Sequence, residues 1–254
     1  MAKDVNQAVR EVCLWLPETA EVVSHGSPNF KVRGKSFAMY VVNHHGDGRT
    51  ALWLNAPAGA QDLYVEAEPK HFFVPPYVGP RGWLGVNLDR GLSWRRIATL
   101  VREAYEKVAP AALAAGVGAT IAIVPPKKAL TEEQLNPLKS KRGQALLRRL
   151  RRICEPLPEV AESTQFGYPI WQAGKRTFAM ARHEDERFLL CFWVGTEQQG
   201  MLTADARYRI PAYLGHNGWI SVDVTTGADW TEIQLLCLQS YRHFALRRML
   251  KAID

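Results

Sequence analysis

The sequence predicts an α+β protein made of two copies of one domain, each an antiparallel sheet covered by helices in the order α-β-β-β-α-β-α. The first observation is an internal repeat, whose two copies are Gly79-x-x-Gly82-Trp83 and Gly215-x-x-Gly218-Trp219. A tryptophan and a tyrosine follow each copy at steps of eleven residues, as Trp94, Tyr105, Trp230 and Tyr241. A repeat of this length indicates a duplicated unit. The hairpins are too tight for parallel crossovers, so the sheets are expected to be antiparallel.

The elements of the first copy follow from local patterns. A helix over residues 4–16 has apolar residues at helical spacing and ends at Leu16-Pro17-Glu18, because proline removes a backbone donor. Strands are expected over 30–33, 37–42 and 51–54, with a tight turn at Gly34-Lys35 and a hairpin loop over 44–48. A short helix over 61–68, a strand over 83–88 and a last helix capped by Ser93 complete the copy.

The second copy repeats this order. Its first helix ends at Leu157-Pro158-Glu159, and Gly174-Lys175 is expected as the turn that matches Gly34-Lys35. The remaining elements are a strand at Phe178-Ala179-Met180, a loop over 184–186, a strand over 188–194, a short helix over 198–206, a strand over 219–224 and a last helix capped by Asp229.

The repeat sets the domain boundaries. We expect a first domain over residues 1–110, a linker over 111–143 and a second domain over 144–254. Within the linker, Ile121–Val124 is expected to pair as an edge strand and residues 131–135 to form a helical turn. The linker is expected to pack in part, because Ile121, Ile123 and Val124 would be costly to expose.

Composition excludes several classes of protein. The N-terminus has no apolar leader, and no apolar run approaches the roughly 18 residues of a membrane span, so the chain is expected to be cytoplasmic and without membrane contact. The four cysteines have neither C-x-x-C nor zinc-ligand spacing. They are interpreted as small buried apolar residues, with a disulfide or redox role as the alternative. No metal site and no cofactor is expected.

One stretch carries a family resemblance. Phe30-Lys31-Val32-Arg33-Gly34-Lys35-x-Phe37-Ala38 resembles the MmcQ/YjbR family, as do Pro76-Tyr77, the strand Trp83 to Val86 and Ala104-Tyr105. The second copy has Tyr213, Trp219 to Val222 and Ser240-Tyr241 at the matching places, but it departs at Gln172-Ala173, and Trp171 stands near the place of Phe30. The resemblance implies a compact α+β fold and a suggested "double-wing" DNA-binding role, although fold alone does not establish function. Most family members look like single domains, so the tandem arrangement is a departure.

The charge is concentrated in one segment. The formal net charge is +7, and residues 139–152 hold seven basic residues and no acid: Lys139, Lys141, Arg142, Arg148, Arg149, Arg151 and Arg152. The aligned positions for the last four are Gln7, Ala8, Arg10 and Glu11, so the fold does not require a basic face. Arginine forks suit phosphate oxygens. The alternatives are a solvated helix face or a protein partner.

Two weaker features also fit a nucleic-acid surface. Lys31, Arg33 and Lys35 alternate on a strand and turn and could share one side, although charges on an edge strand also prevent aggregation. The tryptophans at 83, 94, 219 and 230 are expected in the core. Tyr77 and Tyr213 lie in glycine-rich loops and could stack on bases.

The function predicted from the sequence is that of a non-enzymatic binding protein that contacts nucleic acid, most simply DNA, through its phosphates. Catalysis is poorly supported, because His44-His45 lacks metal-ligand spacing, His25 has no nucleophile elbow beside it, and no P-loop is present. Two alternatives stay open. One is a protein-interaction or chaperone-like adaptor module, and the other is a small-ligand or enzyme pocket near His25, Tyr77 and Trp83.

Overall fold

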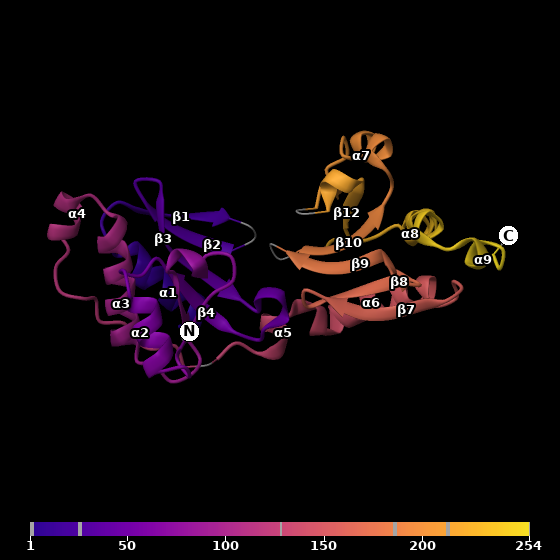
Figure 1. Cartoon of the computed structure of the whole chain (residues 1–254). Coiled ribbons are helices and arrows are strands. Elements are labelled where there is room, and N and C mark those ends of the chain that lie inside the picture. Colours follow the sequence, from indigo (N-terminus) through magenta and orange to yellow (C-terminus); the bar gives the residue numbers. More distant parts are fainter. Residues whose placement is uncertain (1–2, 25–26, 128, 185–186, 212–213, 254) are drawn as a thin grey trace. The chain divides into compact units, whose positions relative to one another are not determined.

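The computed structural model describes residues 3–24, 27–127, 129–184, 187–211 and 214–253. The chain divides into two compact units, Met1–Thr131 and Glu132–Asp254 (Figure 1). We call them the first and the second domain. The segment expected as a linker is thus divided between the two units, and most of it belongs to the first.

The first domain contains a single sheet and the helices that pack on it. Its elements in chain order are α1 (Val5–Leu14), β1 (Thr19–Ser24), β2 (Ser27–Val32), β3 (Lys35–Val42), η1 (His44–Gly46), β4 (Thr50–Leu54), α2 (Ala60–Ala67), β5 (Phe72–Phe73), η2 (Gly79–Arg81), β6 (Leu84–Asn87), α3 (Trp94–Val108) and α4 (Ala111–Ala115).

The second domain repeats that order, without a counterpart of η1 in its described part, and adds α5 and η3 before its first long helix. Its elements are α5 (Glu132–Leu135), η3 (Pro137–Lys139), α6 (Lys141–Cys154), β7 (Val160–Gln165), β8 (Tyr168–Ala173), β9 (Arg176–Glu184), β10 (Arg187–Trp193), α7 (Thr196–Leu202), β11 (Tyr208–Arg209), η4 (Gly215–Asn217), β12 (Trp219–Asp223), α8 (Trp230–Phe244) and α9 (Arg247–Leu250).

Each domain holds one six-stranded sheet whose neighbouring strands all run antiparallel. The strand orders are β1-β2-β3-β4-β6-β5 and β11-β12-β10-β9-β8-β7, which are the same topology read from opposite edges. The α+β class and the tandem duplication are therefore confirmed. Each sheet has two more strands than the sequence predicted. These are the edge strands β1 and β7, and the two-residue strands β5 and β11.

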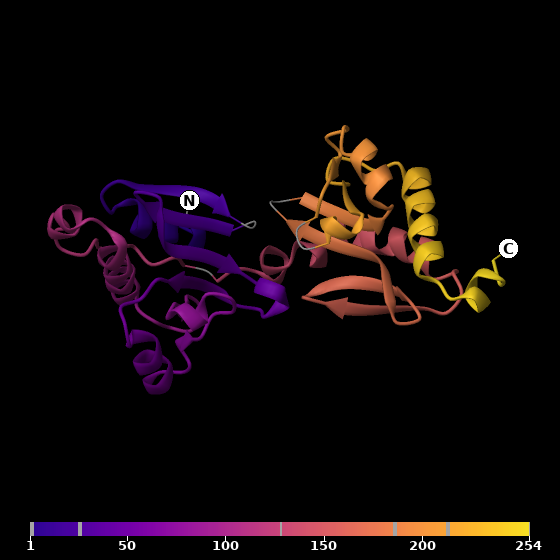
Figure 2. The ribbon, with the colours of Figure 1, turned by 45° about the horizontal axis from the view of Figure 1, so that its top comes forward.

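Both faces of each sheet are apolar, and they are covered differently. In β4, Leu52 and Leu54 belong to the main core beneath α1 and α3, while Ala51 and Trp53 belong to a smaller cluster with Trp83 on the opposite face. This alternation follows from the two-residue period of a strand. The second domain has the same two clusters, and Figure 2 shows α8 lying alongside its sheet.

The repeated glycines are explained by one loop geometry. A Cβ built on Gly79 would lie 2.5 Å from Cγ1 of Val74, and one on Gly215 would lie 2.1 Å from Cγ2 of Ile210. The second glycine of each motif ends the 3-10 turn with a positive φ, 78° at Gly82 and 82° at Gly218. Glycine is needed at the first position for space and favoured at the second for its backbone conformation.

A glutamine fastens this loop in both domains. The Gln61 amide donates to the carbonyls of Gly79 and Trp83 at 2.9 and 2.5 Å. The Gln199 amide donates to those of Gly215 and Trp219 at 2.7 and 2.6 Å. The short helix of each domain therefore serves to place one amide beside the loop.

The long helices α3 and α8 are each anchored through a tyrosine. The hydroxyl of Tyr105 donates to the carbonyl of Pro17 at 2.9 Å, and that of Tyr241 donates to Pro158 at 2.7 Å. The Leu-Pro-Glu helix ends are thus held by the final helix of the same domain. Ser93 and Asp229 cap the two final helices as predicted.

Three sequence-based predictions are wrong in detail. Ile121–Val124 forms no strand; Ile121 and Ile123 pack on the first core, while Val124 is exposed. Glu184 ends β9 and does not begin a loop. Val32 pairs with Lys35, and Ala173 pairs with Arg176. The turn Gly174-Lys175 of the second domain therefore corresponds to Arg33-Gly34 of the first, and not to Gly34-Lys35 as expected.

Candidate nucleic-acid interface

The basic segment of residues 139–152 forms most of helix α6, whose start is fixed locally. The Ser140 hydroxyl caps the helix by accepting the Gly143 amide at 3.1 Å. A Cβ on Gly143 would lie 2.6 Å from backbone atoms of Pro137 and Leu138, so η3 packs directly on the first turn. Leu147 and Leu150 are buried against the core. The basic side chains therefore project from the other faces of the helix.

Some of these charges are already paired. Lys139 lies 3.3 Å from Glu132, and Arg151 makes a two-pronged contact with Glu162 at 2.8 Å. Arg10 and Glu21 make the equivalent two-pronged contact in the first domain at 2.7 Å. The Arg151 pair therefore belongs to the shared architecture, where it fastens the first helix to the edge strand.

The other basic side chains of α6 are exposed. Among the residues that the structure describes, Lys141, Arg148 and Arg152 make no ion pair. Arg142 and Arg149 instead lie over aromatic rings, 5.6 Å from the Phe188 centroid and 4.3 Å from the Trp230 centroid. These five residues are the part of the predicted patch that has no carboxylate partner among the described residues.

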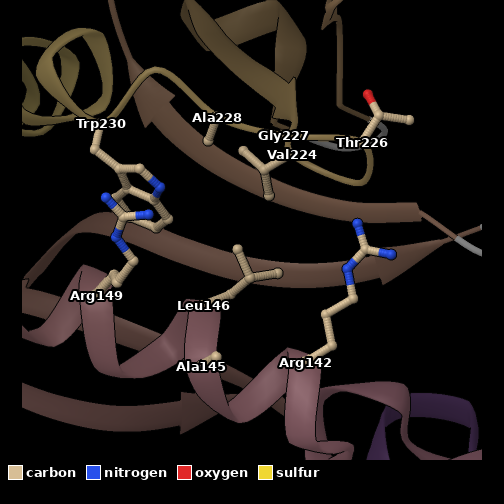
Figure 3. Close-up of a pocket in the computed structure, with 9 residues that line it drawn as sticks. All are labelled: Arg142, Ala145, Leu146, Arg149, Val224, Thr226, Gly227, Ala228 and Trp230. Atoms are coloured by element: carbon tan, nitrogen blue, oxygen red, sulfur yellow. The ribbon is translucent and has the colours of Figure 1, made fainter.

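Arg142 and Arg149 line an open trough of about 410 Å³ between α6 and the segment leading into α8 (Figure 3). Leu146 points into it between the two arginines, and the Trp230 ring forms one end beneath Arg149. The other lining residues are Ala145, Val224, Thr226, Gly227 and Ala228. The trough thus combines an apolar floor with two cations and has no acidic lining residue.

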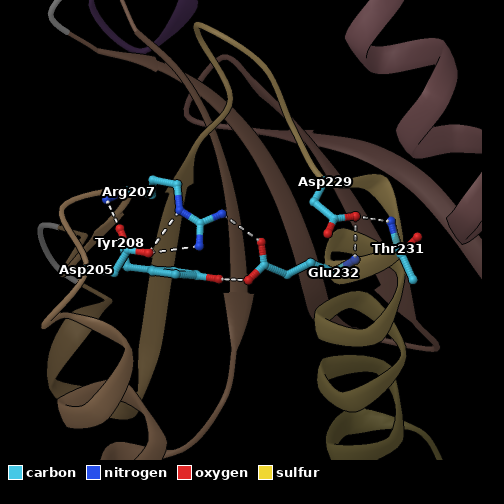
Figure 4. Close-up of polar contacts among 6 residues, drawn as sticks. All are labelled: Asp205, Arg207, Tyr208, Asp229, Thr231 and Glu232. Atoms are coloured by element: carbon cyan, nitrogen blue, oxygen red, sulfur yellow. Dashed lines mark hydrogen bonds and ion pairs between the residues drawn. The ribbon is translucent and has the colours of Figure 1, made fainter.

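Two carboxylates near the trough in sequence, Asp229 and Glu232, are engaged elsewhere. Asp229 accepts the backbone amides of Thr231 and Glu232 at 2.9 and 3.3 Å (Figure 4). Glu232 receives the guanidinium of Arg207 at 3.1 Å and the hydroxyl of Tyr208. Burial and the Glu232 carboxylate raise the pKa of Tyr208 to about 12, so this hydroxyl stays a donor. Neither carboxylate is placed to neutralise Arg149.

The residues that form the trough differ from those at the matching places of the first domain. Arg149 corresponds to Ala8, which is fully buried. Ala228 corresponds to Leu92, whose larger side chain is buried in the first core. The first turn of α6, which carries Arg142, precedes the place at which α1 begins with Val5. The two arginines and the small Ala228 are therefore specific to the second domain.

The second predicted basic patch is only partly available. Arg33 occupies a tight turn and makes a two-pronged contact with Glu18, one prong of which measures 2.9 Å. Lys35 is exposed and Lys31 is half-buried. In the second domain Gly174 takes the place of Arg33, and Glu159, the counterpart of Glu18, pairs with Arg248 of α9 at 2.6 and 2.7 Å. The matching glutamate is thus paired with an arginine in both domains, which indicates a structural role for Arg33.

The aromatic residues proposed for stacking or for the core lie in different environments. Tyr77 is exposed, but its hydroxyl lies 2.8 Å from Nε2 of His45, so its ring is held in a cluster with His44 and His45. Tyr213 lies outside the described residues, as does His25. Trp83, Trp94 and Trp219 are buried, as predicted. Trp230 packs against the second core as predicted, but it is only half-buried, and Arg149 lies over its ring.

The histidine cluster carries backbone strain. His45 and Tyr77 have φ values of 52° and 62°, a region that costs most residues free energy. The His44 ring lies 4.9 Å from the Trp53 centroid, and its buried Nε2 has no hydrogen-bond partner among the described residues. Burial, and to a smaller extent His45, lowers the pKa of His44 to about 4. The His44 ring is therefore neutral at ordinary pH.

Comparison with known proteins identifies the fold family. The family model described as YjbR matches twice, at residues 14–107 and 156–243. A solved structure titled as Deinococcus radiodurans protein DR2400, with the domain DUF419, is 23% identical; the alignment covers 42% of this chain and 79% of that chain, with a TM-score of 0.36. A search of curated proteins gave no match. In the described ranges no helix is long and apolar enough to cross a membrane.

Proposed function

This chain belongs to the YjbR family, with two tandem copies of that domain, and we propose that it is a non-enzymatic, cytoplasmic protein that binds nucleic acid, DNA in the first instance, through its phosphates. One observation carries the proposal: α6 presents Lys141, Arg142, Arg148, Arg149 and Arg152 without a carboxylate partner among the described residues. The cytoplasmic assignment is supported by four free, buried cysteines, since reducing compartments keep thiols unpaired.

The internal duplication strengthens the electrostatic argument. The same helix in the first domain carries Gln7, Ala8 and Glu11 at the positions of Arg148, Arg149 and Arg152. The fold therefore forms without a basic face at this helix. Cations that no carboxylate neutralises are the groups that can replace counterions along a phosphate backbone. Lys139, Arg151 and Arg33 are left out of the proposed contact set because each already has a carboxylate partner.

The test is an anisotropy titration of labelled DNA at several salt concentrations. The double variant Arg148→Gln/Arg152→Gln should bind more weakly, and its log–log salt slope should be shallower by about 1.8, since each phosphate contact contributes about 0.9. The control is Arg81→Gln/Arg95→Gln, which removes two exposed arginines of the first domain and changes the net charge equally. Equal effects of the two variants would show that net charge, and not α6, governs binding.

A second candidate, a protein-interaction module, is favoured by exposed apolar side chains of the first domain. Trp15, Val22 and Val23 are 40%, 43% and 66% exposed. The matching residues of the second domain are Pro156, Ser163 and Thr164, so the fold does not require apolar side chains there. This role would be supported by a partner protein that stays bound to the wild type at high salt and no longer binds the variant Val22→Ser/Val23→Thr. If the partner is lost only from the variant Arg148→Gln/Arg152→Gln, this role is excluded.

A further inference from the structure

We infer that the trough beside α6 takes one unpaired base of a single nucleic-acid strand, with the flanking phosphates on Arg142 and Arg149. This inference rests on the proposed function and makes it more specific. It follows from three properties of the trough, which are its mixed chemistry, the spacing of its arginines and the residue that opens it.

The floor of the trough is apolar, whereas a phosphate-binding surface needs no such floor. Leu146 and Val224 lie between the two arginines, and the Trp230 ring forms the end of the floor under Arg149 (Figure 3). The paired and stacked bases of a duplex present only their edges. A duplex bound to α6 would therefore leave this apolar floor exposed to water. A flat, apolar ring can cover it, and an unpaired base is such a ring on a strand that also carries phosphates.

The arginines are placed at the two ends of that floor. They are seven residues apart on one helix, which is close to two turns, so both project from the same side about 10.5 Å apart along the axis. Arg149 uses one face of its guanidinium on the Trp230 ring and keeps its N–H edges for an acceptor. A strand whose base enters between the two arginines places a phosphate beside each.

A single small residue opens the trough. Ala228 stands where the first domain has Leu92, which is buried in its core. Half-buried Leu146 corresponds to buried Val5, which starts the shorter helix α1. The second domain therefore has space at a position that the shared fold can fill, and it has arginines at both ends of that space. A purely electrostatic surface would require only the arginines.

The experiment compares three labelled probes of equal length on the full chain: a pyrimidine single strand, the same strand with abasic sites throughout, and a duplex. The wild-type protein should bind the pyrimidine strand at least about five-fold more tightly than the abasic strand, which corresponds to the lower end of base-stacking contributions. Ala228→Leu should bind the two strands equally, with its affinity for the abasic strand unchanged from that of the wild type. Ala161→Leu, an exposed position on β7 of the same domain, is the control.

The outcomes separate this inference from the function on which it rests. Equal binding of the abasic and pyrimidine strands, or tighter binding of the duplex, overturns the inference. If that binding still weakens as the salt concentration rises, the proposed function stands. Binding of none of the three probes overturns both. The base dependence is measured on the wild-type chain, so it decides the question even if Ala228→Leu fails to fold.

Discussion

The guanidinium carbon of Arg149 lies 4.3 Å from the centroid of the Trp230 ring, and this contact joins α6 to the first turn of α8. The matching residues of the first domain are Ala8 and Trp94, and both are buried in its core. Of the two matching helix pairs, the one in the second domain is thus bridged by a cation.

Removing that cation should loosen the bridge. Arg149→Ala is expected to lower the free energy of unfolding of the second domain by about 0.5–1 kcal/mol, the usual contribution of a cation–π contact near the surface. It should also increase acrylamide quenching of Trp230, read against a Trp230→Phe background. Arg148→Ala removes a neighbouring charge that has no ring contact and serves as the control. The cation–π assignment fails if the two variants are equally stable and equally quenched.

The glutamine that holds each glycine loop should contribute unequally in the two domains. Gln199 is buried, so Gln199→Leu leaves two carbonyls without a donor, at a cost of about 2 kcal/mol. Gln61 is half-buried, so water can replace its amide and Gln61→Leu should cost less. Urea unfolding with hydrogen exchange at η2 and η4 measures both effects. Gln234→Leu, exposed on α8, should change neither loop.

The close approach at the first glycine of the motif predicts a rescue. Gly79→Ala places a methyl group 2.5 Å from Val74 and should destabilise the first domain by about 1–3 kcal/mol. Adding Val74→Ala should restore most of that loss, because it removes the atom in the way. Gly116→Ala, where a Cβ has at least 3.5 Å of space, should be nearly neutral. A double variant no more stable than Gly79→Ala would contradict the steric explanation.

His44 should make the first domain sensitive to mild acid. Its pKa is about 4 in the folded state, so between about pH 6.5 and 4 the unfolded chain binds a proton that the folded chain does not. Stability should therefore fall as the pH falls through this range, by about 1 kcal/mol given that solvent partly screens the ring. NMR titration of the His44 ring gives the pKa directly.

The control for this effect is His44→Phe, which keeps an aromatic ring beside Trp53 and cannot be protonated. Its unfolding free energy should depend less on pH between 6.5 and 4 than that of the wild type. An ordinary pKa for His44 in the NMR titration would remove the basis of the prediction.

The local chemistry of the chain was sufficient to predict where α3 and α8 begin. Ser93 and Asp229 precede apolar stripes of 3.6-residue period, and both cap as expected. The edge strands β1 and β7 were missed because their outer residues are exposed, so no two-residue alternation marks them. Their pairing comes from the neighbouring strand, which single-sequence periodicity does not contain.

The sequence by itself determined the duplication, the α+β class and the excess of positive charge on one helix, because each can be read from the order of residues along the chain. Only the tertiary structure decided which cations remain available and where the trough opens. Glu132 and Glu162 neutralise Lys139 and Arg151 across turns and strands. The trough walls come from residues 142–149 and 224–230, which meet only when α6 packs beside α8.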